Sequence, residues 1–319
     1  PHPILTEEDI ARLRASNLTD YRVATVPMLF EPDPHDPAGA LCRGIDRMIA
    51  SAERAIASGA SLLILSDRDA SAEQAPLPSL LATAALHHGL LDRALRGEAG
   101  IVLESGEPRE VMHFCLLLGF GANAVSPYVA FQTLANLHAG GELGDLTGEQ
   151  VVDNYIAAVK KGILKVMSKM GISTLRSYRS AQIFECIGLS PEVVDAYFKG
   201  AVSRIGGIGL AEIAREAIER HGQAFGPRRA GDVMLDFGGE YQVREAGEKH
   251  TWNAESVTYL QQAVRTGDYE AYRTFAAIIN DRARTFCTLR GLFELAGGEP
   301  VPLEEVEPAG EIVKRFYTG

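Results

Sequence analysis

Two acidic side chains stand where short apolar runs of this sequence end, and they are the residues best placed for chemistry. Asp67 follows the run Leu62–Leu65, and Glu104 closes the run Ile101–Glu104. The carboxyl ends of parallel strands meet at one edge of a sheet or barrel, so we expect the two carboxylates to lie close together. Such a pair could perform acid–base catalysis on a small anionic metabolite. Carboxylate pairs are weakly specific evidence, so the favoured interpretation is structural: Asp67 pairs with Arg68 or caps the next loop.

The other motifs that could bind a ligand or take part in catalysis also favour structural interpretations. The stretch Gly119–Ala124 partly matches GxGxxA, but it leaves a helix and enters a strand, the reverse of a dinucleotide-binding turn. The stretch Ser203–Gly209 could present backbone amides to an anion, yet no GKS or GKT sequence accompanies it. His87, His88 and His113 lie in helical stretches, where adjacent histidines face different directions, so we expect no metal ligands among them. No serine stands in GxSxG, and no cysteine carries a nucleophile signature.

An alternation of short apolar runs and helical stretches between residues 22 and 126 must position these residues. The predicted strands are Val23–Leu29, Leu62–Leu65, Ile101–Glu104 and Asn123–Ser126, and the predicted helices are Ala40–Ser58, Pro78–Arg96 and Glu107–Leu118. Alternation of this kind predicts βα units that build a parallel sheet.

The rest of the chain is expected to be mostly helical. Thr147 and Gln150 have capping-box spacing before an apolar stripe, so a helix is predicted over Gly148–Met170, with Gly171 as its C-cap. Short extended pieces, further helices and two connections follow. The extended pieces are Ile172–Leu175 and Gln182–Ile187; one helix starts at Ser190-Pro191, others span 208–224 and 253–284 with a break at Thr266–Asp268; the connections are 231–252 and 297–310.

The composition excludes several classes of function. The 319 residues carry a net charge of -11, so the chain lacks the basic footprint that nucleic acid or an anionic membrane requires. No apolar run approaches the roughly 20 residues that cross a bilayer, and no signal peptide is visible. Cys42, Cys115, Cys186 and Cys287 lie too far apart for a zinc or iron–sulfur motif, so reduced thiols in a soluble, cytoplasmic protein are expected. Because the chain opens with Pro1, we expect a segment of a longer protein.

A long polar stretch in the middle of the chain fits no catalytic arrangement. Residues 161–185 read KGILKVMSKMGISTLRSYRSAQIFE and hold no nucleophile beside a base. Lys161, Lys165 and Lys169 form a basic stripe near a helix C-terminus, where positive charge is favourable in any case, so a solvated helix face would explain the lysines. The polar run continues to Gln182, however, and so long a run would suit a surface covered by another domain.

Besides GILKVMSKMGISTLRSYRSAQIFECIGLS, several other stretches of the chain match the sequence pattern of one protein family. They are Pro3–Thr6, Leu63–Arg68, Ala75–Ala82, Val111–Gly119, Ser203–Gly209, Gly238–Tyr241, Val306–Pro308 and Val313–Phe316. The pattern resembles the central domain of the glutamate synthase large subunit over essentially the whole chain. Met234–Phe237 and Thr251–Asn253 depart from the family pattern, which leaves their local conformation open.

The resemblance implies an α/β fold: an incomplete, rudimentary TIM-barrel-like parallel βα domain with a mostly helical C-terminal third. The expected parts are the βα-barrel core at 1–225, the helical part of the same domain at 226–296, and a connector toward a flavin-binding domain at 297–319. The family's large subunit also contains an N-terminal glutaminase domain, a flavin barrel with FMN and an iron–sulfur cluster, and a C-terminal β-helix. That enzyme makes two glutamates from 2-oxoglutarate and glutamine, with ammonia passing between its two active sites.

What the family pattern requires for catalysis is missing from this segment. The sequence has neither the N-terminal cysteine nucleophile of the glutaminase nor the spaced cysteines of the cluster. The resemblance therefore implies a structural linker that helps wall the ammonia channel, binds no cofactor of its own and makes no glutamate alone. Its expected partners are the glutaminase and flavin-binding domains of the same parent chain, with ammonia in transit and with no nucleic acid or membrane.

The polar face expected to pack on neighbouring domains includes Lys165, Ser168, Lys169, Arg176, Ser177 and Arg179. The ammonia path is expected along Ser66–Ser71 and Ser168–Ser173, because ammonia needs modest hydrogen-bonding groups rather than fixed charges. Together the candidate residues are Ser66, Asp67, Arg68, Ser71, Lys165, Ser168, Lys169, Ser173, Arg176, Ser177 and Arg179. Two alternatives stay open: a free-standing βα-barrel enzyme that uses Asp67 and Glu104, and a flavin-binding barrel.

Overall fold

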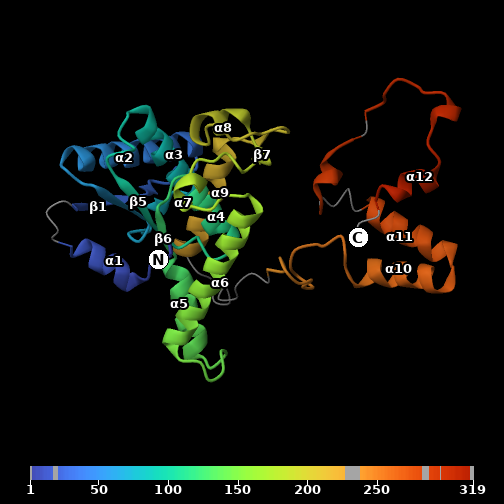
Figure 1. Cartoon of the computed structure of the whole chain (residues 1–319), viewed down its shortest axis with the longest axis horizontal. Helices are drawn as coiled ribbons and strands as arrows, with labels where there is room; N and C mark the ends of the chain where they lie inside the picture. The colour runs from blue at the N-terminus through green and yellow to red at the C-terminus, as the bar shows by residue number, and fades with distance from the viewer. Residues whose placement is uncertain (1, 17–20, 227–237, 282–286, 295, 317–319) are drawn as a thin grey trace. The chain divides into compact units, whose positions relative to one another are not determined.

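The short apolar runs of the first half pair into one parallel sheet in the computed structural model, which describes residues 2–16, 21–226, 238–281, 287–294 and 296–316 (Figure 1). In spatial order, its strands are β1 (Val23–Pro27), β3 (Leu62–Ser66), β5 (Gly100–Glu104) and β6 (Ala124–Ser126). The register pairs Ser66 with Glu104 and Glu104 with Ser126, so the carboxyl ends of three strands meet at one edge. The predicted parallel βα arrangement is confirmed, while no closure of the sheet into a barrel is seen in the described part.

The two faces of this sheet pack against different helices. Leu63 and Leu65 belong to the main core, which they share with α2 (Pro37–Ala57), α3 (Ser79–Asp92) and α4 (Val111–Gly119). Ile64 and Val102 point to the other face, because successive strand residues alternate in direction. There they pack against Ile10 of α1 (Glu7–Arg14), a helix that the sequence pattern did not predict.

The remaining elements of residues 1–227 are helical, apart from two short strand pairs. The helices are α5 (Tyr128–Ala139), α6 (Gly148–Lys169), α7 (Leu175–Tyr178), α8 (Pro191–Tyr197) and α9 (Leu210–Phe225); β2 (Leu29–Phe30) pairs with β4 (Ala75–Pro76), and β7 (Gly188–Leu189) with β8 (Gly207–Ile208). The capping box of α6 is confirmed, since Thr147 Oγ1 accepts from the Gln150 amide at 3.2 Å and the Thr147 amide donates to Gln150 Oε1 at 2.9 Å.

Two expectations about the middle of the chain are wrong. Leu175 was expected to close an extended piece, but it begins α7, because Thr174 Oγ1 accepts from the Ser177 amide at 3.3 Å and caps a helical turn. The expected strand at Gln182–Ile187 is reduced to one isolated bridge between Glu185 and Val202. The sequence pattern also gave no sign of α5, whose apolar residues do not gather on one stripe.

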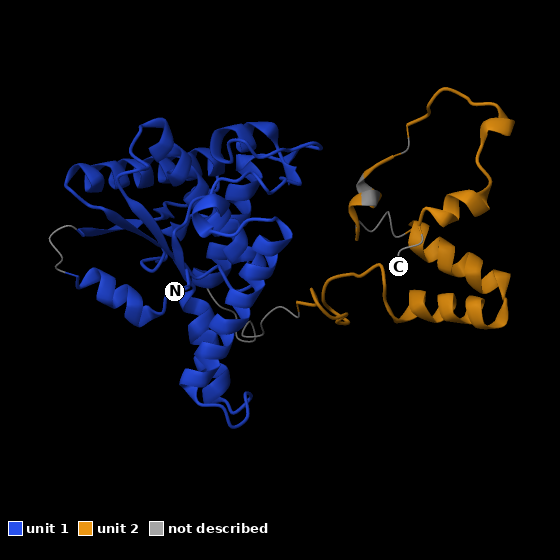
Figure 2. Cartoon of the chain, in the orientation of Figure 1, with its two compact units in different colours: residues 1–227 blue, residues 228–319 orange. Residues whose placement is uncertain are grey.

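The chain divides into two compact units, residues 1–227 and 228–319 (Figure 2). The second contains α10 (Ala254–Thr266), α11 (Tyr269–Asp281), the 3-10 turns η2 (Leu289–Leu292) and η3 (Leu303–Glu305), and α12 (Ala309–Lys314). Gly267 separates α10 from α11 with φ of 68°, a left-handed conformation that glycine adopts at low cost, so the predicted break is confirmed.

Some expectations for this unit lie outside the described residues, namely 231–237 of the expected connection and 282–284 of the expected helix. The expected boundary at 296/297 stays a prediction. None of the described helices is both long and apolar enough to span a membrane.

Candidate functional site

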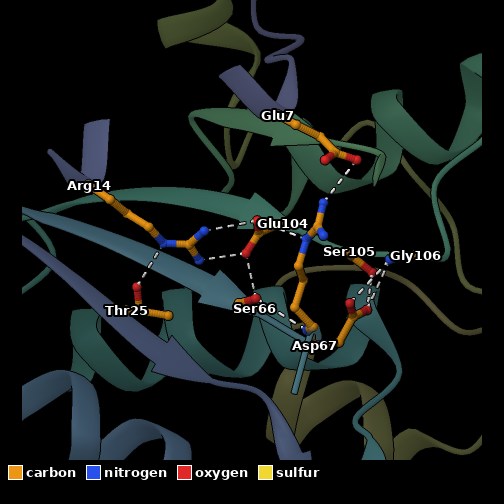
Figure 3. Close-up of polar contacts among 9 residues, drawn as sticks. Glu7, Arg14, Thr25, Ser66, Asp67, Glu104, Ser105 and Gly106 are labelled. Carbon is orange, nitrogen blue, oxygen red and sulfur yellow. Dashed lines mark hydrogen bonds and ion pairs between the residues drawn. The ribbon is translucent and has the colours of Figure 1, made fainter. Parts of the chain in front are cut away.

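The two carboxylates predicted to meet at a sheet edge do lie there together (Figure 3). Glu104 is the last residue of β5, and Asp67 follows the last residue of β3. With the side chains that surround them, they form what we name the strand-end cluster. Its members are Arg14, Ser66, Asp67, Arg68, Glu104 and Ser105.

Glu104 is the centre of this cluster and is surrounded by donors. Its side chain is 3% exposed, and it accepts two bonds from Arg14, at 2.7 and 3.2 Å, in a bidentate arrangement. Ser66 Oγ donates at 2.6 Å, and Arg68 Nε lies 3.3 Å away. Burial raises the pKa of Glu104, but the bonds from Arg14 and Ser66 and the two arginine charges outweigh it, so the pKa lies below its ordinary value. Glu104 is therefore an ionised, fully engaged carboxylate at neutral pH.

Asp67 uses a different set of donors and holds the loop after β5. Ser105 Oγ donates to its carboxylate at 2.6 Å, and the Gly106 amide donates at 3.1 Å. Burial raises the pKa of Asp67 above its ordinary value, although these bonds and one from Tyr128 oppose the shift. The expected pairing of Asp67 with Arg68 is not what the structure shows, whereas a loop-holding role is.

Arg68 turns away from Asp67 because two other carboxylates attract it. Its Nη2 lies 2.9 Å from Glu7 Oε1, and its Nε faces Glu104. The guanidinium also lies 4.3 Å from the ring centre of Tyr128, a cation–π distance. The side chains of the cluster thus bond to one another, and both Glu104 and Asp67 have hydrogen-bond donors within the chain. This arrangement argues against an acid–base pair available to a substrate.

A cavity of about 340 Å³ opens where α3 and α4 begin, and its lining includes Ser79, Glu107, His113 and Arg220. A helix N-terminus here could hold a flavin phosphate. The Glu107 carboxylate already occupies it, since Glu107 Oε2 accepts from the Ser79 amide at 2.7 Å and Arg220 Nη1 lies 3.5 Å from Glu107 Oε1. The start of α4 is likewise closed, because His113 Nδ1 accepts from the Glu110 amide at 3.2 Å. These residues do not fit a phosphate-bearing cofactor.

The cysteines do not fit an iron–sulfur cluster. Cys42 lies on α2, Cys115 on α4 and Cys186 beside β7, and Cys287 belongs to the second unit. In the described ranges, no three side chains of the metal-binding types come together. Burial raises the pKa of the Cys115 and Cys186 thiols, which further disfavours the thiolate form that ligates iron.

The second group of predicted residues lies on the surface of α6, α7 and the turns around them. Lys165, Ser168, Lys169, Ser173, Arg176 and Ser177 are exposed, and Arg179 is half-buried. Ser66 and Asp67, in contrast, are buried, Arg68 is partly exposed, and the carbonyl of Ser71 is bonded to His221 Nε2 at 2.7 Å.

The two groups of candidates lie at opposite edges of the sheet. The turn after α7 sits on the end of α4, because the Ser180 amide donates to the Gly119 carbonyl at 2.8 Å and Tyr178 Oη donates to the Cys115 carbonyl at 3.2 Å. Since α4 starts after β5 and stops before β6, its C-terminus lies at the side of the sheet where the parallel strands begin. Residues 66–71 follow β3 and lie at the side where the strands end. The structure therefore does not join the two groups into one site.

Sequence reasoning missed a partly buried polar network at the turn after α7. His87, 5% exposed, accepts at Nδ1 from Arg96 Nε at 2.9 Å, so its proton sits on Nε2 and is donated to Ser180 Oγ at 2.7 Å. Burial and the charge of Arg96 lower the pKa of His87 to about 3. His87 is thus a core histidine, and no spacing in the sequence links it to Ser180, 93 residues away.

A family model described as the glutamate synthase central domain matches residues 1–190 of this chain. The chain is 42% identical over 318 residues to the glutamate synthase (NADPH) large chain of Bacillus subtilis, covering 99% of this chain and 20% of that protein. It is 38% identical over 325 residues to the glutamate synthase (NADH) of Schizosaccharomyces pombe, covering 100% of this chain and 15% of the relative. It is 37% identical over 330 residues to the ferredoxin-dependent glutamate synthase of Cyanidium caldarium, covering 99% of this chain and 21% of the relative.

Among solved structures, a mutant flavocytochrome b2 with benzoylformate aligns with 42% of this chain and 31% of its own, at 17% identity and a TM-score of 0.34. The chain spans only 15% to 21% of the length of the three relatives above.

Proposed function

This chain belongs to the glutamate synthase central domain family, and we propose that it links the glutaminase and flavin-binding domains of a glutamate synthase large chain. In this role it serves as a rudimentary βα barrel that helps wall the path of ammonia, and it makes no glutamate by itself. The short share of each relative that the chain spans supports partners within the same parent chain.

The observation that carries this proposal is that the carboxylates of the strand-end cluster are already bonded to donors within the chain. In enzymes built from parallel βα units, the carboxyl ends of the strands hold the reacting groups. Here Glu104 is surrounded by Arg14, Ser66 and Arg68. A fully paired cluster stabilises this end of the sheet and leaves neither carboxylate without hydrogen-bond donors, which favours a structural role.

The proposal assigns FMN and the iron–sulfur cluster of the parent enzyme to other domains. The carboxylate of Glu107 at the start of α3 and the separation of the four cysteines support this assignment. The purified chain is expected to be colourless after incubation with FMN and gel filtration. Co-elution of flavin absorbance with the protein would instead support the flavin-barrel alternative.

Ammonia requires hydroxyl and backbone groups that bind it weakly. Ser168 and Ser173 are exposed near the amino edge of the sheet, and residues 66–71 leave its carboxyl edge. Because the two stretches lie at opposite edges, they would line separate parts of a passage. Each part can then be tested by its own substitution.

The test uses the full-length large chain that carries this segment with Ser168→Trp. The indole would narrow the passage, so glutamine hydrolysis is expected to continue while glutamate formed per glutamine hydrolysed falls and free ammonia appears. Ser168→Ala is the matched control and should keep the two activities coupled. Full coupling in the tryptophan variant would exclude a passage beside Ser168.

A further inference from the structure

One stretch of this acidic chain holds several lysines and arginines and no acidic residue. Between Asp153 and Glu185 there is no Asp or Glu, although the chain as a whole has a net charge of -11. We name residues 154–184 the basic segment. It contains Lys160, Lys161, Lys165, Lys169, Arg176 and Arg179.

The cations of the basic segment lack the ion pairs that are common elsewhere on this unit. The four lysines and Arg176 are exposed, and none of the six cations forms an ion pair with a described residue. By contrast, Arg12 pairs with Glu8, Arg43 with Asp36, and Lys199 with Asp92. Because no acid lies within the segment, nothing in its own sequence can balance its charge.

Arg179 is the least favourably placed of these cations. Its Nε is buried and has no hydrogen-bond partner among the described residues. Burial lowers the pKa of Arg179, and the charge of Arg176 lowers it further. Two neighbouring cations repel each other, so a partner carboxylate at the accessible part of this guanidinium would offset the repulsion from Arg176.

The turn that carries these arginines is held rigidly before any partner arrives. Tyr178, between Arg176 and Arg179, is 0% exposed and is bonded to the Cys115 carbonyl. Ser180 is fixed by His87 and by the Gly119 carbonyl. A preorganised turn loses little conformational entropy on binding, which favours recognition.

Exposed apolar side chains lie beside lysines on α6. Leu164 is 58% exposed and shares its helix face with Lys160 and Lys161 through spacings of four and three, and Met170 at the helix end is 47% exposed. Exposed apolar side chains flanked by charged ones are typical of protein–protein interfaces. Nucleic acid is a poorer match, because phosphates do not cover exposed leucine and methionine and the whole chain is acidic.

We propose that the basic segment is the docking surface for an acidic face of a neighbouring domain of the parent chain, with a partner carboxylate bound at Arg176 and Arg179. This inference rests on the proposed linker function and adds the chemistry of the partner. Leu164 and Met170 supply the apolar contact, and the lysines around them set the orientation of the partner.

The test is zero-length cross-linking of the full-length large chain with a carbodiimide, which joins a lysine amine to a carboxylate in contact with it. Peptides containing Lys161, Lys165 or Lys169 are expected to be joined to Asp or Glu residues outside these 319 residues. Lys199 is the internal control, because it should be joined to Asp92. If the lysines of the basic segment react only with carboxylates within these 319 residues, or with none, the proposal is overturned.

A charge-reversed variant removes the remaining ambiguity. Lys161→Glu with Lys165→Glu should lower the cross-linking yield of Lys169 several-fold, whereas Arg54→Glu, an exposed change on α2, should leave it unchanged. Circular dichroism checks that both variants are folded. Binding of labelled single-stranded RNA that disappears in the reversed variant would also overturn the proposal. Loss of coupling in Ser168→Trp without these cross-links would retain the linker function and reject the acidic partner.

Discussion

The strand-end cluster and the basic segment are both rich in charged side chains, but only the first pairs them with groups of opposite charge within the described residues. Around Glu104, two arginines and a serine satisfy one buried carboxylate. In the basic segment, six cations have no acidic partner within the described residues. The first region therefore completes its interactions within the fold, and the second leaves them open.

This difference distinguishes charged residues that stabilise the fold from charged residues that are free to bind a partner, and the sequence alone does not distinguish them. A charged cluster whose groups are mutually satisfied stabilises the structure around it, because each buried group has a partner. Charges without partners stabilise nothing within the unit and keep their capacity to bind something else. Substitutions in the two regions should therefore differ in their effect on the free energy of unfolding.

The largest effect is expected where the basic segment is anchored to the core. Tyr178→Ala removes a fully buried ring and leaves a cavity, so the free energy of unfolding should fall by about 3–5 kcal/mol. Tyr178→Phe, the matched control, removes just the bond to the Cys115 carbonyl and should lower it by about 1 kcal/mol. Urea denaturation followed by circular dichroism measures both. Equal, small losses would mean that the turn is loosely attached, which would break the comparison.

The next largest effect is expected at the centre of the strand-end cluster. Glu104→Gln keeps the shape of the side chain but leaves Arg14 and Arg68 without their shared charge, so unfolding should become easier by about 2–3 kcal/mol. Glu8→Gln disrupts an exposed pair with Arg12 and should change the free energy by less than about 0.5 kcal/mol. The same urea titration serves for both. Similar values for the two variants would contradict a structural role for the cluster.

A third effect concerns the network under the basic turn and appears as pH dependence. The folded pKa of His87, about 3, lies below its ordinary value of 6.5, so between these values the unfolded chain binds a proton that the folded chain does not. The contribution of neutral His87 to the free energy of unfolding is therefore fully present above pH 6.5. It is lost as the pH decreases, by at most about 1.4 kcal/mol per pH unit.

Urea midpoints between pH 7 and 5 measure this slope. The His87→Gln variant, which cannot be protonated, should show a flatter dependence. In the wild-type protein, NMR should show a His87 ring that stays neutral over the same range. A ring that titrates near its ordinary value would mean that the network opens readily.

The smallest effect is expected in the exposed part of the basic segment. Lys165→Gln removes a charge that has no acidic partner in the described structure, so the free energy of unfolding of this chain should change by less than about 0.5 kcal/mol. Thermal denaturation of this variant beside Glu104→Gln sharpens the comparison. A large loss for Lys165→Gln would reveal an internal partner and contradict an open surface.

The sequence by itself determined the local features of this protein. Alternating runs predicted the strands of the parallel sheet, the capping box predicted where α6 begins, and Gly267 predicted the break between α10 and α11. The absence of acid between Asp153 and Glu185 is also a fact of the sequence alone. These features could be predicted because each depends on residues that are close together in the chain.

Only the tertiary structure decided how the charged groups are paired. Arg14 reaches Glu104 across 90 residues, and His87 reaches Ser180 across 93. Arg68, the immediate neighbour of Asp67, binds Glu7 and Glu104 instead, because the fold sets the direction of each side chain. Whether a charge is satisfied depends on which distant segments the fold brings within hydrogen-bonding distance, and no local pattern contains that information.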